Sequence, residues 1–275
     1  MIYKIIVLFP LLLISCSATT DMGNSLSNKL SGSEIISMLD NLEQSERENK
    51  IFDLILDKET PSFLEQLSEI KVIGTIWGIS YELIYYVTPD YFSLGTDEDY
   101  FLIPMTPILA QKVANHYEAI LPTKKIVDQI YERATIKFSP QPIPPTTEMI
   151  TIKVFAAHND SIAQQRKAFF SNYDLSTLAG GHKKDVIISN SIYSKLKPNV
   201  PNPVVIYGWH MLNGDPIQPV YNGHNNDYAD YSHGIRLVKN KCKLDGKDTC
   251  LTDILKDPQL AVLISNEGVI MKAEY

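Results

Sequence analysis

The sequence predicts an α+β fold with a helical N-terminal part, antiparallel strands after it, and a mixed or antiparallel β core in the C-terminal half. Two observations indicate this class. Apolar residues recur at helical spacing near the N-terminus, as in Ile35, Ile36 and Leu39. From Lys71 to Met105, by contrast, the chain is rich in β-branched and aromatic residues, which is typical of strands.

The first residues have the layout of an export signal. Lys4 precedes an apolar run of ten residues, Ile5 to Ile14, whereas a membrane-spanning helix needs about 20. A short positive start, an apolar run and small residues are typical of a secretory signal. The run ends at Ser15 and Cys16 in the string LISC, which resembles the lipobox of bacterial lipoproteins. The resemblance implies cleavage before Cys16 and lipidation of that cysteine; an ordinary signal peptide with a chance cysteine is the alternative.

We therefore expect three segments: a lipoprotein signal peptide (1–15), a flexible tether (16–32) and a single integrated α+β domain (33–275). The tether is polar, rich in small residues and without periodicity. Acyl chains on Cys16 would hold the protein at a membrane surface. The residue after the cysteine is Ser17 and not an aspartate. By analogy with the sorting of Gram-negative lipoproteins, this favours the outer membrane over the inner membrane.

The N-terminal half of the domain predicts helices and strands in alternation. One or two helices are expected in 32–58, and Thr60-Pro61 is a helix-start signal. Three antiparallel strands should follow up to Met105, with a turn at 95–99. Two further helices are expected after Thr106-Pro107 and in 123–134.

The second half begins after 139–148, which contains four prolines and is a candidate sub-boundary or an extended surface segment. Beyond it the pattern predicts a helix, three strands and a short C-terminal helix. Their expected ranges are Ser161–Ser171, Lys184–Ser189, Val204–Trp209, Gly234–Lys241 and Thr252–Ile264.

Cys242 and Cys250 flank a predicted hairpin. With a three-residue loop at 245–247, the two cysteines would face each other, close to disulfide geometry. We expect a disulfide, with two free thiols as the alternative. Two cysteines are too few ligands for a zinc site.

The net charge of −7 argues against a nucleic-acid partner, because such proteins carry a basic patch. The 44% hydrophobic content is ordinary for a globular protein.

Histidines concentrate between 182 and 233, each near a predicted strand end, where a scaffold can present functional groups. Histidine transfers protons near neutral pH and binds metals. The candidate catalytic residues are His210, His224, Asp230, Ser232 and His233. If a divalent metal such as zinc binds, the three histidines of this set would be its ligands. A solvated polar loop is the alternative.

A second set of residues is expected to contact the substrate. Arg236 lies three residues beyond His233, so on a strand the two side chains would point to opposite faces unless the chain turns at Gly234. The full set comprises His182, Lys183, Trp209, Tyr231 and Arg236.

The string SHGIRLV, which contains Ser232, His233 and Arg236, resembles the signature of L,D-transpeptidases, which crosslink peptidoglycan peptides. The family's catalytic cysteine is missing between Gly234 and Ile235, so its thiol chemistry does not transfer. The strings LPTKKIVDQIY, AGGHKKDVIIS, IYGWH and DYSHGIRLV together resemble a family of exported bacterial proteins. That resemblance spans most of 85–270 and implies one integrated unit, without a mechanism.

Three kinds of function follow from these patterns. The first is a hydrolase or transferase acting on an envelope polymer, peptidoglycan or glycan. The second is a non-catalytic lipoprotein that binds a ligand in an aromatic and histidine pocket. The third is a structural envelope protein without a site.

Overall fold

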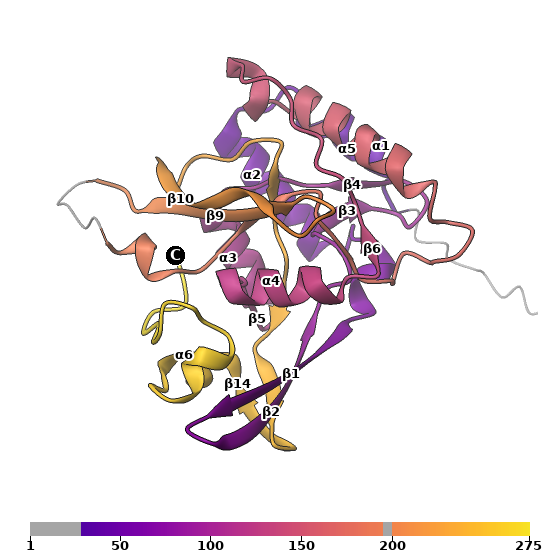
Figure 1. Ribbon diagram of the computed structural model, residues 1–275. Coiled ribbons are helices and arrows are strands. Elements are labelled where there is room, and N and C mark those ends of the chain that lie inside the picture. The colour runs from indigo at the N-terminus through magenta and orange to yellow at the C-terminus, as the bar shows by residue number, and fades with distance from the viewer. Residues whose placement is uncertain (1–28, 195–199) are drawn as a thin grey trace, which may run out of the picture.

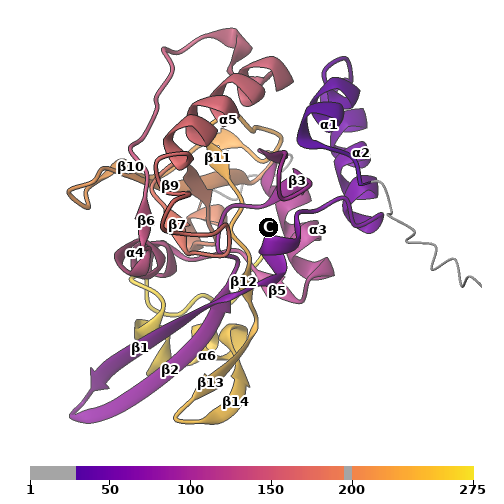
Figure 2. The same ribbon diagram turned by 90° about the vertical axis from the view of Figure 1, so that its right-hand side faces the viewer.

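The computed structural model describes residues 29–194 and 200–275, which form an α+β fold, as predicted (Figures 1 and 2). The predicted signal peptide, Cys16 and nearly all of the tether lie outside these residues. Within the described part, no helix combines the length and apolar character needed to cross a membrane.

The two helices predicted after Thr106-Pro107 and in 123–134 are present, and each begins at a threonine cap. Thr106 Oγ1 accepts a hydrogen bond from the Leu109 N–H (3.3 Å), and Thr123 Oγ1 accepts one from the Ile126 N–H (3.1 Å). The helices are α1 (Gly32–Leu39), α2 (Gln44–Leu56), α3 (Pro107–His116), α4 (Lys124–Arg133), α5 (Ile152–Arg166) and α6 (Leu251–Lys256), with 3-10 helices η1 (Ser62–Glu65), η2 (Thr147–Ile150), η3 (Asn190–Ile192) and η4 (Leu260–Leu263).

Three helix predictions were wrong in kind or extent. The predicted helix Thr252–Ile264 is instead two pieces, α6 and the 3-10 helix η4. Thr60-Pro61 begins only the 3-10 helix η1, because the chain enters strand β1 at Ser68, and pairing with β2 overrides the local helix-start signal. Helix α5 begins at Ile152, well before the predicted Ser161, and Thr151 caps it.

The largest sheet has the order β14-β13-β2-β12-β5, with β1 on the other edge of β2. Strands β1 and β2 form a long antiparallel hairpin that extends away from the body in both views (Figures 1 and 2). The strands are β1 (Ser68–Ile76), β2 (Ile79–Val87), β5 (Ala119–Ile120), β12 (Val238–Lys239), β13 (Lys241–Leu244) and β14 (Lys247–Cys250).

The second sheet, with the order β10-β9-β8-β11, positions the candidate site. Its pairs are antiparallel except for the parallel pair of β8 and β11. The sequence did not predict β10, because its side chains are mostly polar and exposed and two register shifts interrupt it. The strands are β8 (Lys184–Val186), β9 (Pro203–His210), β10 (Pro216–Asn225) and β11 (His233–Gly234).

Two short strand pairs complete the fold: β3 (Ser93–Gly95) with β4 (Tyr100–Leu102), and β6 (Ile136–Lys137) with β7 (Ala179–Gly180). The turn at 95–99 lies where it was predicted. The proline-rich segment 139–146 contains neither helix nor strand. Buried side chains from both sides of it belong to one hydrophobic cluster.

The predicted register of the cysteine hairpin was wrong. Cys242 pairs with Thr249, and Cys250 pairs with Lys241. The loop has two residues, Asp245 and Gly246, both with positive φ, because an Asp-Gly pair suits a two-residue turn. The one-residue shift places the two cysteines on opposite faces of the hairpin, and both are free thiols in the structure.

Candidate functional site

A buried ionic network lies beside β8, and we call it the Asp90 network: Asp90, Arg166, His182 and Arg236. The Asp90 carboxylate accepts hydrogen bonds from the Arg166 guanidinium and from His182 Nε2, the latter at 2.9 Å. All four side chains are buried. Burial favours the neutral form of Asp90, but Arg166 and His182 outweigh it and hold the pKa of this carboxyl below its ordinary value.

Arg236 was predicted to contact a substrate, but its side chain forms hydrogen bonds with the backbone instead. Its guanidinium donates to the carbonyls of Thr88 (2.9 Å) and Ala179 (2.7 Å) and lies 4.3 Å from the centre of the Tyr91 ring. His182, predicted for the same role, is bound to Asp90. These two side chains therefore hold segments of the fold together, which is a structural use of buried charge.

Four of the five predicted catalytic residues, all except His210, lie together, and we define the His233 cluster as Lys184, His224, Tyr228, Asp230, Ser232 and His233. Asp230 Oδ1 accepts from the Ser232 N–H (2.8 Å) and hydroxyl (2.5 Å), and Asp230 Oδ2 accepts from the Tyr228 hydroxyl (3.0 Å). The short segment from Tyr228 to His233 supplies these groups locally, which is why the sequence could indicate them together.

His233 is the most distinctive member of the cluster. Its ring is completely buried, and neither ring nitrogen has a hydrogen-bond partner among the described residues. Burial lowers the pKa of His233 to about 4, despite the nearby Asp230 carboxylate. The imidazole is therefore neutral at pH 7, and its unprotonated nitrogen has a lone pair that no described donor faces.

Three half-buried side chains lie near His233. The His224 ring stacks on the Tyr228 ring at 4.0 Å between centroids, and Tyr228 meets His233 edge-on at 5.7 Å. The third is Lys184, whose ammonium lies 5.2 Å from the Trp209 ring centre. Lys184 and His224 can attract an anionic group, so the arrangement suits a carboxylate or phosphate near the surface of the cluster.

The end of β9 that carries Trp209 has an unusual backbone. Trp209 has φ 57 and the preceding Gly208 has φ 106. Positive φ is costly for a bulky residue, and such strain concentrates at functional sites. The buried indole N–H of Trp209 also has no protein partner in the described part of the chain.

Lys183 lies behind the cluster. Its ammonium donates to the Tyr231 carbonyl at 2.6 Å and lies 3.3 Å from His158 Nδ1. Burial lowers the pKa of Lys183 to about 7. Sequence reasoning missed His158, although its position between the buried residues Phe155 and Ile162 of α5 could have indicated a buried histidine.

His210 lies in a different group of side chains. Its Nε2 is 3.3 Å from Asp128 Oδ1, its ring stacks on Tyr131 at 4.4 Å, and Asp128 also accepts from the Tyr207 hydroxyl at 2.6 Å. Asp128, on α4, was not predicted. The expected convergence of His210 with His224 and His233 in one cleft is therefore not seen.

Asp185 lies behind His210. Burial raises the pKa of Asp185 to about 6, and its carboxylate accepts from the Tyr91 hydroxyl at 2.8 Å. Asp185, His210 and Arg236 line a cavity of about 10 Å³, which has room for one water molecule.

The contacts of these side chains do not favour a zinc site formed by His210, His224 and His233, because His210 lies apart from the other two. Within residues 29–194 and 200–275, no three His, Cys, Asp or Glu side chains are placed to hold a metal ion.

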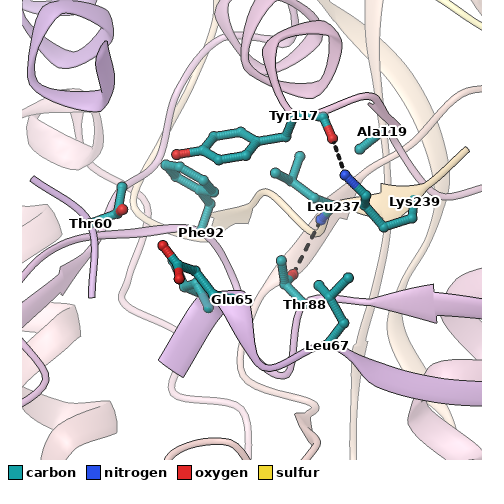
Figure 3. A pocket seen from close by; sticks show the side chains of 10 residues that line it. Thr60, Glu65, Leu67, Thr88, Phe92, Tyr117, Ala119, Leu237 and Lys239 are labelled. Atoms are coloured by element: carbon teal, nitrogen blue, oxygen red, sulfur yellow. Dashed lines mark hydrogen bonds between the residues drawn. The ribbon is translucent and has the colours of Figure 1, made fainter. Parts of the chain in front are cut away.

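An apolar pocket lies apart from the His233 cluster and from the side chains around His210. It lies between η1 and the ends of β5 and β12 (Figure 3). Its volume is about 200 Å³, and a cavity of about 150 Å³ can hold benzene. The Phe92 and Tyr117 rings form one side, Glu65 reaches the same space, and the Lys239 ammonium is bound to the Tyr117 carbonyl. The pocket could hold one small molecule with a single aromatic ring.

Comparisons with protein-family models, with curated proteins and with solved structures find no match for this chain. The structure itself therefore defines the class: an α+β protein with a buried ionic network and a neutral histidine that has no hydrogen-bond partner among the described residues.

Proposed function

We propose that the protein is a lipid-anchored component of the bacterial cell envelope and that the His233 cluster performs a hydrolase or transferase reaction on an envelope polymer, peptidoglycan or glycan. The observation that supports this most is the neutral His233 imidazole, which is buried near Lys184, His224 and Tyr228 and has no hydrogen-bond partner within residues 29–194 and 200–275. The LISC string supports the anchor, and the likeness of SHGIRLV to the L,D-transpeptidase signature supports an envelope substrate.

In this proposal His233 is the general base. The Ser232 hydroxyl donates a hydrogen bond to Asp230. It therefore does not donate to His233, as the hydroxyl of a serine nucleophile would donate to its general base. A water molecule, or a hydroxyl of the polymer, is the better nucleophile, and His233 would take its proton. Lys184 and His224 would hold an anionic group of the substrate. Tyr228 covers His233, so we expect this side chain to move when substrate binds.

The test is digestion of purified peptidoglycan and of model glycans, with products separated by chromatography and identified by mass spectrometry. We expect His233→Gln to abolish product formation, whereas His116→Ala, an exposed histidine on α3, should leave it unchanged. Products from the His233→Gln protein at the normal rate would overturn the assignment, as would an inactive wild-type protein.

A binding lipoprotein is the second candidate, and the pocket in Figure 3 favours it. Benzylamine and toluene are suitable probes, because one ring fits the volume and Glu65 could accept from an amine. Ligand-detected NMR should show binding that Ala119→Leu, which narrows the pocket, abolishes. Equal signals with the wild-type protein and the variant would count against this site.

A further inference from the structure

The tip of the β1–β2 hairpin is uncharged and exposes large apolar side chains. No charged residue occurs between Lys71 and Glu82, which form an ion pair at 2.6 Å. Beyond that pair, Ile73 exposes 68% of its surface, Trp77 83% and Ile79 55%. One face of β1 at the tip packs on η4, where Ile76 is buried and Gly74 lies against Leu263, whereas the Ile73, Trp77 and Ile79 side chains remain exposed and apolar.

Trp77 occupies a position that its backbone disfavours. It is the first residue of a two-residue hairpin loop and has φ 49, and Gly78 follows with φ 83. Such turns favour Asn, Asp or Gly at this position, since positive φ is costly for a bulky side chain. The side chain is mostly exposed, so little packing within the protein offsets that cost. A residue that breaks a local rule without a packing gain indicates a function.

Among the strands of residues 29–194 and 200–275, none lies beside the tip. β13 pairs with β2 only at Leu83 and Ile84, so the hairpin continues beyond the rest of the sheet. The register runs from the Ile73–Glu82 pair to the Ile76–Ile79 pair. Those three further residues extend about 10 Å at the usual rise of a strand.

We propose that this tip inserts into the interfacial layer of a lipid bilayer made of zwitterionic lipids. Trp is enriched at membrane interfaces, and a depth of about 5–10 Å is typical of interfacial insertion. Charges of both signs lie near the base of the tip in equal number: Lys71, Arg133, Lys243 and Lys247 accompany Glu82, Glu132, Asp245 and Asp248. Anionic lipid is therefore not required.

A protein partner fits this surface less well. A stable interface buries about 800 Å² on each side, and three side chains on a narrow hairpin offer much less. The proposal goes beyond the enzymatic function and does not depend on lipidation of Cys16.

The test uses the chain that begins at Ser17, which has no signal peptide and no acyl group and keeps every residue that the structure describes. The chain has two tryptophans, and Trp209 is 3% exposed, so a change in fluorescence on adding vesicles reports on Trp77. With phosphatidylcholine vesicles, the emission should shift to shorter wavelength, and brominated acyl chains should quench it.

Variants separate insertion from chance adsorption. Trp77→Ala should lower vesicle partitioning about tenfold or more, because the indole supplies most of the inserted apolar area. Leu212→Ala removes a side chain that is 62% exposed in another turn and should leave partitioning unchanged. The wild-type partitioning should persist at high salt, since the charges balance.

Three results would overturn the proposal: no quenching by brominated lipid, equal partitioning of the wild-type and Trp77→Ala proteins, or loss of binding at high salt. Sedimentation that shows self-association through Trp77 without vesicle binding would overturn it in favour of a second copy of the chain.

Discussion

At the scale of single residues, the buried charges around β8 set how stability depends on pH. Burial lowers the pKa of Lys183 to about 7, whereas the pKa of lysine in an unfolded chain is about 10.4. Between these values the unfolded chain binds more protons than the folded one. The free energy of unfolding therefore rises with pH in this window, by up to about 1.4 kcal/mol per unit.

Lys183→Met should remove this contribution. We expect the free energy of unfolding, measured by urea denaturation from pH 7 to pH 9, to rise less steeply in the variant than in the wild-type protein. The comparison of slopes isolates Lys183, because its neighbours His158 and His233 have pKa values lowered to about 2 and about 4 and do not titrate between pH 7 and pH 9. Identical slopes would mean that the folded pKa of Lys183 is ordinary.

Gly234 is required for close packing rather than for a special backbone conformation. A Cβ atom there would lie 2.6 Å from Lys183 Cβ and from the Tyr91 ring. Gly234→Ala should lower the free energy of unfolding by about 2 kcal/mol, because overpacking distorts its neighbours. Gly180→Ala is the control, since its nearest contacts would be at 3.5 Å. Thermal unfolding of both variants measures the difference, and equal midpoints would contradict this account.

At the scale of helices and strands, local signals were reliable where a single residue completes a helix end. Thr123 accepts from the Ile126 N–H and also donates to the Ile264 carbonyl. Thr123→Ala should therefore destabilise the protein by about 1–2 kcal/mol. Thr151→Ala, which removes a weaker and partly exposed cap at 3.4 Å, should cost less. Urea denaturation compares the two, and a larger loss for Thr151 would refute this ranking.

Signals failed where backbone pairing with a neighbouring strand, rather than the segment's own residue pattern, decides the structure. The helix start at Thr60 is overridden by β1, whose partner β2 follows it along the chain. Strand β10 pairs with β9 through backbone bonds and has mostly exposed side chains, so its apolar pattern is weak. Periodicity reports burial, and neither element could be assigned from periodicity alone.

At the scale of the whole molecule, the proposed anchor can be tested by cell fractionation. Cys16→Ala should prevent acylation, so that the protein is either released from the membrane fraction or left unprocessed. Cys250→Ala should remain anchored. A processed Cys16→Ala protein that is still fully retained in membranes would argue against a lipid anchor.

The candidate site was predictable only where it is local in the chain. Asp230, Ser232 and His233 lie together in the sequence and were indicated as a group. His158 and Asp128 come from helices far away, and no spacing rule connects either with its partner, Lys183 or His210. The apolar pocket likewise combines residues from distant segments.

The Asp90 network has a consequence for how fast the chain folds. Asp90 lies 76 residues from Arg166 and 92 from His182, and Arg236 lies 148 residues from Thr88. Each of these loops must close before its buried charge gains a partner, and a high contact order slows folding. Refolding from urea should therefore be slower than for a helical protein of this length, and in the proposed export of the chain this delay would keep it unfolded long enough for a translocation channel to accept it.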